Sequence, residues 1–292
     1  MDLKQLHYFV TVADEGSITA GAKKLFITQP PLSMQLKELE EELGCTLFER
    51  GPRQISLTEP GKILYKHAKT LLSLSHVTKE EVLTAANPQK GTIRIGMVSS
   101  LVCARALCWL AGFAEKYTEI DFEITEGNTY QLLEQLHAGT IHMALIRTPY
   151  ATERTESVSM ARDRMVAVGR KDFFEGCKSV SPRMLADQPL ILYRRWEQTV
   201  RHAFSAEDLK PHVRILADDS RTVVKAAELG MGIALVPQSA TDVLSAEGCE
   251  VRSIEGWNWT SSMDIVHTKD GYLPGCANLF LEYLKDLAEQ EA

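Results

Sequence analysis

The sequence predicts a small, mainly α-helical N-terminal region, one long helix, and a C-terminal α/β region in two lobes. Short helical segments separated by turn residues fill residues 3–60, and one continuous helical pattern follows over 61–86. From Thr92 onward, short β-branched runs alternate with amphipathic helices. The proline and glycine within 87–91 break the long helix and predict a hinge there.

Composition excludes several classes of protein. With 292 residues, 45% hydrophobic and 24% charged, the chain is typical of a globular protein of two or three domains. No apolar stretch reaches membrane-spanning length, and the N-terminus lacks the layout of a signal peptide, so we expect a cytoplasmic protein without a membrane partner. The six cysteines are scattered and form no C-x-x-C pair. We therefore expect reduced thiols and no metal or cofactor; the alternative is a redox-sensing pair of Cys177 with Cys249.

The first sixty residues predict three helices and a hairpin. Apolar residues at three-to-four spacing mark a helix from Leu3, which Gly16 ends and after which Ser17 can cap the next. A third helix opens at Thr28-Gln29-Pro30-Pro31 and ends at Gly44. We expect it to bury four leucines: Leu32, Leu36, Leu39 and Leu43. Residues 46–58 are typical of two short strands around a Gly-Pro turn, which would form a wing.

The second and third helices match the plan of a helix-turn-helix, in which the later helix enters the major groove of DNA. Gln29 can bond adenine edges, Ser33 is adaptable, and Pro30 offers apolar contact to a thymine methyl. Thr28 and Lys37 can hold phosphates. In the wing, Arg50 could reach a phosphate and Arg53 a minor groove. The alternative for this segment alone is an ordinary three-helix bundle with a hairpin.

The charge balance argues against DNA binding at first sight. The chain carries a net charge of −7, and residues 1–60 hold six Lys/Arg against nine Asp/Glu, a net of 6 − 9 = −3. Because phosphate contacts need cations, any DNA-binding face must come from local clustering, with the acids turned away.

At these residues the chain resembles a known family. The runs Phe9-x-x-Val12-Ala13-x-x-Gly16-Ser17, Gln29-Pro30-x-Leu32-Ser33 and Leu47-Phe48-Glu49-Arg50, closed by Leu57-Thr58-x-x-Gly61, are similar to the N-terminal signature of LysR-type transcriptional regulators. The match runs without gaps over about sixty residues. The resemblance implies a winged helix-turn-helix at 1–60 that binds double-stranded promoter or operator DNA.

The resemblance also implies roles for individual residues. It gives base or groove contact to Gln29, Pro30, Ser33 and Arg53, and phosphate contact to Thr28 and Lys37. Many relatives have Arg or His where this chain has Met34, which puts a phosphate contact there in doubt and increases the weight of Lys37, Arg50 and Arg53. For Glu40 and Arg50 the alternative is a structural role, orienting helix and wing.

The long helix over 61–86 predicts an oligomer. Leu64, Ala68, Leu71 and Leu72 lie along one face, which a helix followed by a hinge must bury. Pairing with a second copy would bury it, and the resemblance implies the same: a linker helix that pairs subunits into a homodimer or homotetramer. The alternative is packing within one chain.

The C-terminal two hundred residues predict a parallel α/β sheet. The order is strand 92–98, a helix through Trp109 and Tyr117, strand 122–127, helix 129–137 and strand 142–146. A helix at 220–228 leads into a buried strand at 230–237, and the last helix, 277–288, should return to the first lobe. We expect crossings near 162 and 266, giving lobe I (92–161 plus 266–292) and lobe II (162–265). This layout resembles the periplasmic-binding-protein-like fold of LysR-type effector domains.

Ligands of open α/β sheets bind at the carboxyl ends of the strands. That rule selects five residues in lobe I: Ser99, Ser100, Asn128, Thr129 and Arg147. In lobe II, Tyr193, Thr199 and Pro237 could line the other side. Hydroxyls beside helix N-terminal amides suit a small anionic effector such as a carboxylate. The alternatives are a helix cap for Ser100 and a surface or interlobe ion pair for Arg147.

Catalytic motifs are not found. The chain has no Walker-type or G-x-G-x-x-G loop, no H-E-x-x-H and no G-x-S-x-G. We therefore expect a DNA-binding regulator rather than an enzyme, with RNA polymerase as a further candidate partner. The alternative is a cytoplasmic small-molecule sensor whose DNA binding is weak or lost, to which the acidic balance and Met34 point.

Overall fold

The structure is a computed structural model that describes residues 1–51, 55–101, 104–174, 176–243, 249–257 and 259–291. The chain divides into two compact units, residues 1–84 with 138–140, and residues 85–137 with 141–292. Among the described residues, no helix is long and apolar enough to span a membrane.

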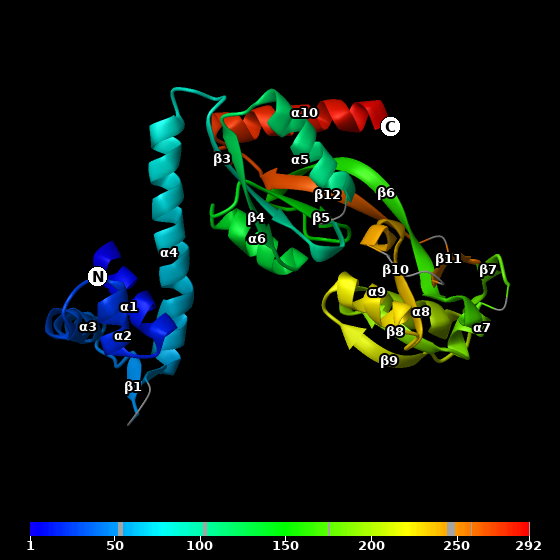
Figure 1. Ribbon diagram of the computed structural model, residues 1–292, viewed down its shortest axis with the longest axis horizontal. Helices are drawn as coiled ribbons and strands as arrows, with labels where there is room; N and C mark the ends of the chain where they lie inside the picture. Colours follow the sequence, from blue (N-terminus) through cyan, green and yellow to red (C-terminus); the bar gives the residue numbers. More distant parts are fainter. Residues whose placement is uncertain (52–54, 102–103, 175, 244–248, 258, 292) are drawn as a thin grey trace. The chain divides into compact units, whose positions relative to one another are not determined.

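The N-terminal unit contains the three helices and the hairpin that the sequence predicts, followed by the long helix (Figure 1). Its elements are α1 (Leu3–Glu15), α2 (Ile18–Lys24), α3 (Gln29–Leu43), β1 (Phe48–Arg50), β2 (Ile55–Leu57) and α4 (Glu59–Thr84). β1 and β2 pair antiparallel, with Phe48 opposite Leu57, so the wing prediction is confirmed for the residues described. Arg53 lies outside the described residues, and of Arg50 only the backbone is described.

Local signals set the ends of these helices. Ser17 Oγ accepts a hydrogen bond from the Ala20 amide and caps α2, as predicted. Thr28 occupies the N-cap position of α3. α1 and α3 end at Gly16 and Gly44, whose φ angles of 62° and 66° are left-handed and favour glycine.

The core of this unit is formed by one apolar face from each helix. Phe9, Val12, Leu32 and Leu39 are completely buried. Leu43, expected in the same row, is 40% exposed. It is the last residue of α3, so the leucine row is buried only as far as Leu39.

The helix α4 spans 26 residues, beginning at Glu59 rather than 61 and ending at Thr84 rather than 86. Ala68 and Val77 are buried, but several large apolar side chains along the helix remain exposed. These are Ile63, Leu71, Leu74, Val82 and Leu83.

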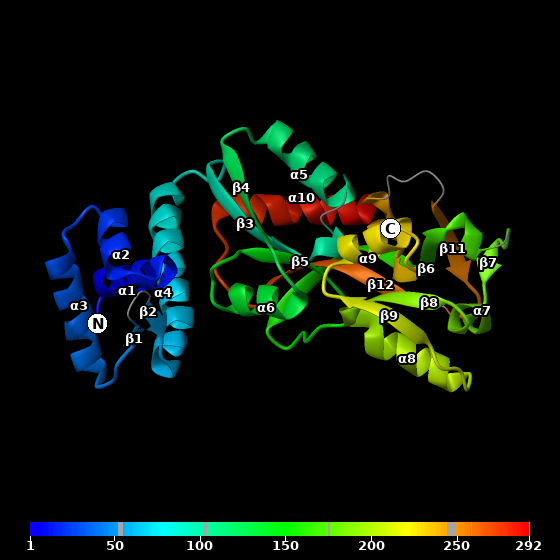
Figure 2. The ribbon, with the colours of Figure 1, turned by 60° about the horizontal axis from the view of Figure 1, so that its bottom comes forward.

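The C-terminal unit contains two sheets joined through a shared strand (Figures 1 and 2). The elements of its first part are β3 (Gly91–Met97), η1 (Ser99–Leu101), α5 (Ala104–Lys116), β4 (Ile120–Glu126), α6 (Thr129–His137), β5 (Met143–Arg147) and β6 (Thr155–Arg170). Those of the second part are η2 (Lys171–Phe173), β7 (Ser179–Val180), α7 (Pro182–Ala186), β8 (Pro189–Tyr193), η3 (Arg194–Trp196), α8 (Glu197–Ala206), β9 (His212–Ala217), α9 (Ser220–Glu228), β10 (Ile233–Pro237), η4 (Gln238–Val243) and β11 (Cys249–Ile254). β12 (Thr260–Thr268) and α10 (Gly275–Glu291) complete the chain.

Lobe I is a sheet in the order β4-β3-β5-β12-β6 with helices on both faces. A Cβ on Gly96 of β3 would lie 2.7 Å from Leu132, so glycine at this position allows α6 to pack closely on that face. On the other face, the rings of Phe113 from α5 and Phe280 from α10 meet Phe122 of β4. Figure 2 shows α5 and α10 together on the side of the sheet away from α6. The return of the last helix to lobe I therefore agrees with the sequence.

Lobe II is built on β6, β10, β8 and β9, with β11 beside β6 and β7 beside β11. β6 belongs to both sheets: residues 155–164 pair with β12, and residues 165–170 pair with β10 and β11. The outward crossing thus lies between Arg164 and Met165, close to the predicted 162. The return lies before Thr260 rather than near 266, because all of β12 pairs within lobe I.

Candidate functional site

The exposed face of α3 carries a row of polar side chains. Gln29, Ser33 and Lys37 follow each other at intervals of four residues and so share one face of the helix. Gln29 Nε2 donates to Ser33 Oγ at 3.3 Å. Leu32, Leu36 and Leu39 hold the opposite face in the core, with 3% exposure at most. The helix is thereby fixed with its polar row outward.

The neighbouring side chains on α3 modify the character of this face. Thr28 and Pro30 are exposed at its start, and Met34 is 55% exposed beside the polar row. Lys37 Nζ lies 3.2 Å from the Glu41 carboxylate, which offsets part of its charge. In water such an exposed pair is weak, about 0–1 kcal/mol, so Lys37 remains available to an anion.

Glu40 fixes the start of the wing. Its Oε1 accepts hydrogen bonds from the backbone amides of Leu47 at 2.6 Å and Phe48 at 3.2 Å. The carboxylate thus ties α3 to β1, which supports the structural alternative for Glu40. The corresponding question for Arg50 concerns a side chain outside the described set.

Phe26 was not among the residues selected from the sequence, but the structure places it in an exposed turn beside α3. It lies between α2 and α3 with a positive φ of 56° and is 96% exposed. A bulky side chain in the left-handed region is uncommon. The only sequence signal was an aromatic residue in a tight turn between two helices.

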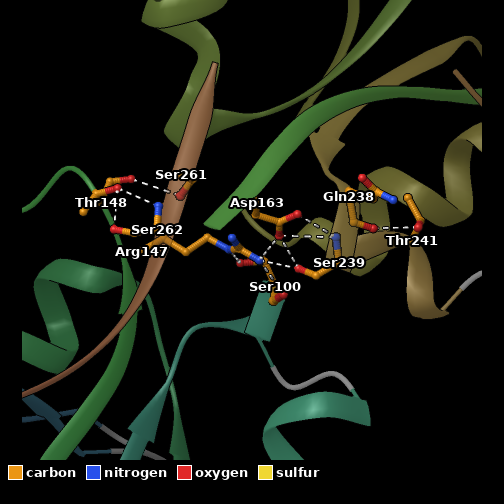
Figure 3. Close-up of polar contacts among 9 residues, drawn as sticks. All are labelled: Ser100, Arg147, Thr148, Asp163, Gln238, Ser239, Thr241, Ser261 and Ser262. Atoms are coloured by element: carbon orange, nitrogen blue, oxygen red, sulfur yellow. Dashed lines mark hydrogen bonds and ion pairs between the residues drawn. The ribbon is translucent and has the colours of Figure 1, made fainter. Parts of the chain in front are cut away.

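In the C-terminal unit, Arg147 lies at the centre of a buried polar cluster (Figure 3). The side chain at the end of β5 has no exposed surface, and its Nη2 lies 2.8 Å from Asp163 Oδ2 on β6. Arg147 Nε donates to Ser100 Oγ at 3.1 Å, and Nη2 also donates to Ser239 Oγ on η4. Ser239 in turn donates its amide to Asp163 at 3.2 Å.

This cluster joins the lobes. Ser100 and Arg147 belong to lobe I, Asp163 to the strand that crosses between the lobes, and Ser239 to lobe II. Arg147 thus forms a buried ion pair with Asp163, which pairs with β12 inside lobe I, and its bond to Ser239 reaches lobe II. The Ser100 hydroxyl accepts from Arg147. Asp163 and Ser239 were not selected by the sequence analysis because their partners lie 16 and 92 residues away along the chain.

Three further predicted residues meet at the boundary between the lobes. Thr129 begins α6 and is 3% exposed; its hydroxyl accepts a hydrogen bond at 2.8 Å from Arg195 of lobe II. Tyr193 ends β8 and is 5% exposed. Burial raises the pKa of Tyr193, and a hydrogen bond with the Ser99 side chain acts in the opposite direction. Ser99, Thr129 and Tyr193 therefore lie where side chains of the two lobes touch.

The other three predicted residues lie differently. Asn128 is exposed and caps α6, with its Oδ1 accepting from the Gln131 amide at 3.0 Å. Thr199 is exposed on α8, and Pro237 is buried at the end of β10, opposite Met165. Arg195 was missed, because only the folded chain brings η3 against lobe I.

A second bridge between the lobes is formed by Arg221 of α9. Its Nη2 lies 2.8 Å from Glu126, at the end of β4, and 2.8 Å from Asp219. Burial alone would raise the pKa of Asp219, but hydrogen bonds from Arg221 keep it below its ordinary value. The charge of Arg221 is thus compensated on both sides.

Comparison with known proteins covers nearly all of the chain. Residues 3–62 match the family model for the bacterial regulatory helix-turn-helix protein of the lysR family, and residues 86–289 match the LysR substrate binding domain. The HTH-type transcriptional regulator BsdA of Bacillus subtilis (strain 168) is 30% identical, with 97% of this chain and 99% of BsdA aligned. CfxR of Cupriavidus necator is 32% identical over 81% of this chain and 75% of its own.

Solved structures agree in fold. CbnR, described as a LysR family transcriptional regulator, superposes with a TM-score of 0.83 at 22% identity, covering 99% of both chains. Full-length CbnR complexed with its target DNA gives a TM-score of 0.82, covering 98% of this chain and all of CbnR.

Proposed function

The chain belongs to the LysR family and is a DNA-binding transcriptional regulator with an effector-binding domain, and we propose that α3 reads promoter DNA under the control of a small anion bound between the two lobes. The observation that carries the proposal is the outward row of exposed Gln29, half-buried Ser33 and exposed Lys37 above a buried leucine row. Short polar side chains near the start of such a helix can approach base edges in the major groove.

The residues at the start of α3 support this orientation, because they are placed to contact phosphates. Thr28 and Pro30 lie at the N-terminus of α3, where the helix dipole attracts anions, although Pro30 and Pro31 offer no N–H. Lys37 extends the same face by two turns, and we propose Arg50 and Arg53 as the wing's contacts. Glu40 holds helix and wing together and so keeps these groups in register.

We further propose that the protein acts as a homodimer or homotetramer assembled through α4. The exposed stripe of Leu71, Leu74 and Val82 would be buried by a second α4. Two heads double the phosphate contacts, which offsets the acidic charge of the chain. RNA polymerase is a further partner in this proposal.

The effector site that we propose lies at the lobe boundary, between Ser99 and Thr129 of lobe I and Tyr193 of lobe II. The hydroxyl groups, together with the start of α6, suit a carboxylate. A ligand can change DNA binding only if its affinity differs between two arrangements of the protein. An open and a closed arrangement of the two lobes would be two such states.

DNA binding is tested by fluorescence anisotropy of the full-length protein with DNA from upstream of its own coding region, in a salt series. We expect Gln29→Ala to weaken binding to this DNA by about tenfold or more, since one good bidentate base contact contributes roughly 1–3 kcal/mol. Gln35→Ala is the matched control: it lies on the same helix, is bonded to Glu38 and lies off the polar row. Equal binding by wild type and Gln29→Ala would contradict the proposal.

A further inference from the structure

Arg195 reaches from lobe II across to lobe I. It lies in η3, directly after β8, and its guanidinium makes three hydrogen bonds, all to lobe I. Nη1 donates to Thr129 Oγ1 at 2.8 Å, and Nη2 donates to the backbone oxygen of Pro149 at 2.9 Å and to that of Arg147. These bonds span the boundary at which Ser99 and Tyr193 also meet.

The charge of Arg195 is not compensated by these partners, since all three acceptors are neutral. Among the described side chains, no carboxylate forms an ion pair with Arg195, and its buried Nε has no hydrogen-bond partner. Burial lowers the pKa of Arg195, and the nearby positive charge of Arg147 acts in the same direction. Buried guanidinium groups normally meet a carboxylate or phosphate, often in a bidentate fork.

The other arginines of this region differ from Arg195. Arg147 forms an ion pair with Asp163, and Arg221 forms ion pairs with Glu126 and Asp219. Arg194, the adjacent residue, is exposed and lies 2.5 Å from Asp218. Within the described part of the lobe boundary, Arg195 is therefore the guanidinium whose charge a ligand could still compensate.

We propose that Arg195 is an interlobe clasp that an anionic effector releases. Without ligand, the guanidinium of Arg195 holds lobe II to the carbonyl oxygens of lobe I. When the effector binds, the guanidinium exchanges these oxygens for the effector's carboxylate. This inference rests on the proposed effector site and names its charge-reading residue. A carboxylate compensates the guanidinium charge and matches its fork in a bidentate pair, which neutral carbonyl oxygens do not do, so the exchange favours a carboxylate over the carbonyl oxygens. Nε and one Nη supply the fork, with Thr129 and Ser99 as neighbouring hydroxyls.

The clasp is tested without knowledge of the natural effector. Cys108 and Cys177 are exposed, one in lobe I and one in lobe II, and can carry a pair of spin labels. The other four cysteines are replaced by alanine, and labelled full-length protein is diluted with unlabelled protein so that distances within one chain dominate. Pulsed electron paramagnetic resonance then gives the label-to-label distance distribution for the labelled parent, Arg195→Gln and Arg194→Gln.

Ligand binding is measured on the same full-length proteins by thermal shift titration. The probes are acetate, butanoate, phenylacetate and succinate, each beside its neutral amide. Arg195→Lys is included because it keeps the charge but loses the fork. It also serves as the informative variant should Arg195→Gln not fold.

The proposal predicts that Arg195→Gln shifts or broadens the interlobe distance without ligand, whereas Arg194→Gln superposes on the parent. Carboxylates that stabilise the parent should bind Arg195→Gln at least tenfold more weakly and Arg195→Lys at an intermediate level, with no such loss for the amides. An unchanged distance distribution in Arg195→Gln, or in Arg195→Lys should the first not fold, overturns the clasp. Undiminished carboxylate binding by Arg195→Gln overturns the role of Arg195 in binding the effector's carboxylate. If amides but no carboxylates stabilise the parent, the proposed anionic effector fails, while the distances still decide the clasp.

Discussion

Replacing Arg147 by methionine removes the cation from the buried cluster but keeps most of its apolar volume. The side chains of Arg147 and Asp163 are 0% and 7% exposed, so the change leaves a buried carboxylate whose remaining donors are the amide and hydroxyl of Ser239. Breaking a buried pair by removing one partner costs about 3–5 kcal/mol. In a region of about 200 residues, each kcal/mol of lost stability lowers the Tm by about 2–4 °C. The Tm of the C-terminal unit should therefore fall by about 6–20 °C.

The assay is differential scanning calorimetry of the full-length protein with a double variant and a surface control. Arg147→Met with Asp163→Asn removes both charges and should lie within about 2 kcal/mol of the wild type. Arg201→Met breaks an exposed pair with Glu197 and should cost at most about 1 kcal/mol. The reasoning is refuted if Arg147→Met costs no more than this control, or if the double variant is less stable than Arg147→Met.

Three further predictions follow from single side chains. Lys37→Gln should reduce the salt slope of DNA binding, measured by anisotropy, by about 0.9 for each head that loses a phosphate contact; an unchanged slope excludes the contact. Tyr150→Phe removes the hydroxyl that donates to the buried Asp264 Oδ2 at 2.7 Å. The free energy of unfolding, measured in urea, should fall by about 1–3 kcal/mol. An unchanged free energy of unfolding would contradict this prediction. The pKa of Tyr150 is raised by burial to about 12, so the donor persists at neutral pH. Burial lowers the pKa of His137, so the unfolded chain takes up the proton first and stability should fall as pH drops below the ordinary value of 6.5. His137→Gln should flatten this fall in urea unfolding measured across pH, and an unchanged fall would contradict the assignment.

The parts of the fold set by local chemistry could be predicted from the sequence. The bounds of α3 follow from the prolines in its first turn and Gly44 at its end. The α/β alternation predicts the parallel pairing of β3 with β4 and β5, but not the antiparallel pairing of β12 with β5 and β6. Leu43 fits the apolar period of α3 yet is exposed, because periodicity gives a face but not how far along the helix that face is covered.

The candidate effector site was predictable only in part. The rule on strand ends selected Ser99 and Thr129, and Tyr193 was expected to line the side of lobe II; all three lie at the boundary of the lobes. Asn128 also follows a strand, but its amide serves the adjacent turn of α6. Arg195 follows β8 as well, and its role depends on acceptors 46 to 66 residues away in lobe I, which no local pattern encodes.

The central claim, that α3 reads base edges, is tested most directly by selecting binding sequences from a random DNA pool with the wild type and Gln29→Ala. We predict that the wild type enriches a two-fold symmetric motif and that Gln29→Ala loses base preference at one position in each half-site, leaving the others intact. Enrichment of the same motif by both proteins, with the same preference at every position, would contradict the account.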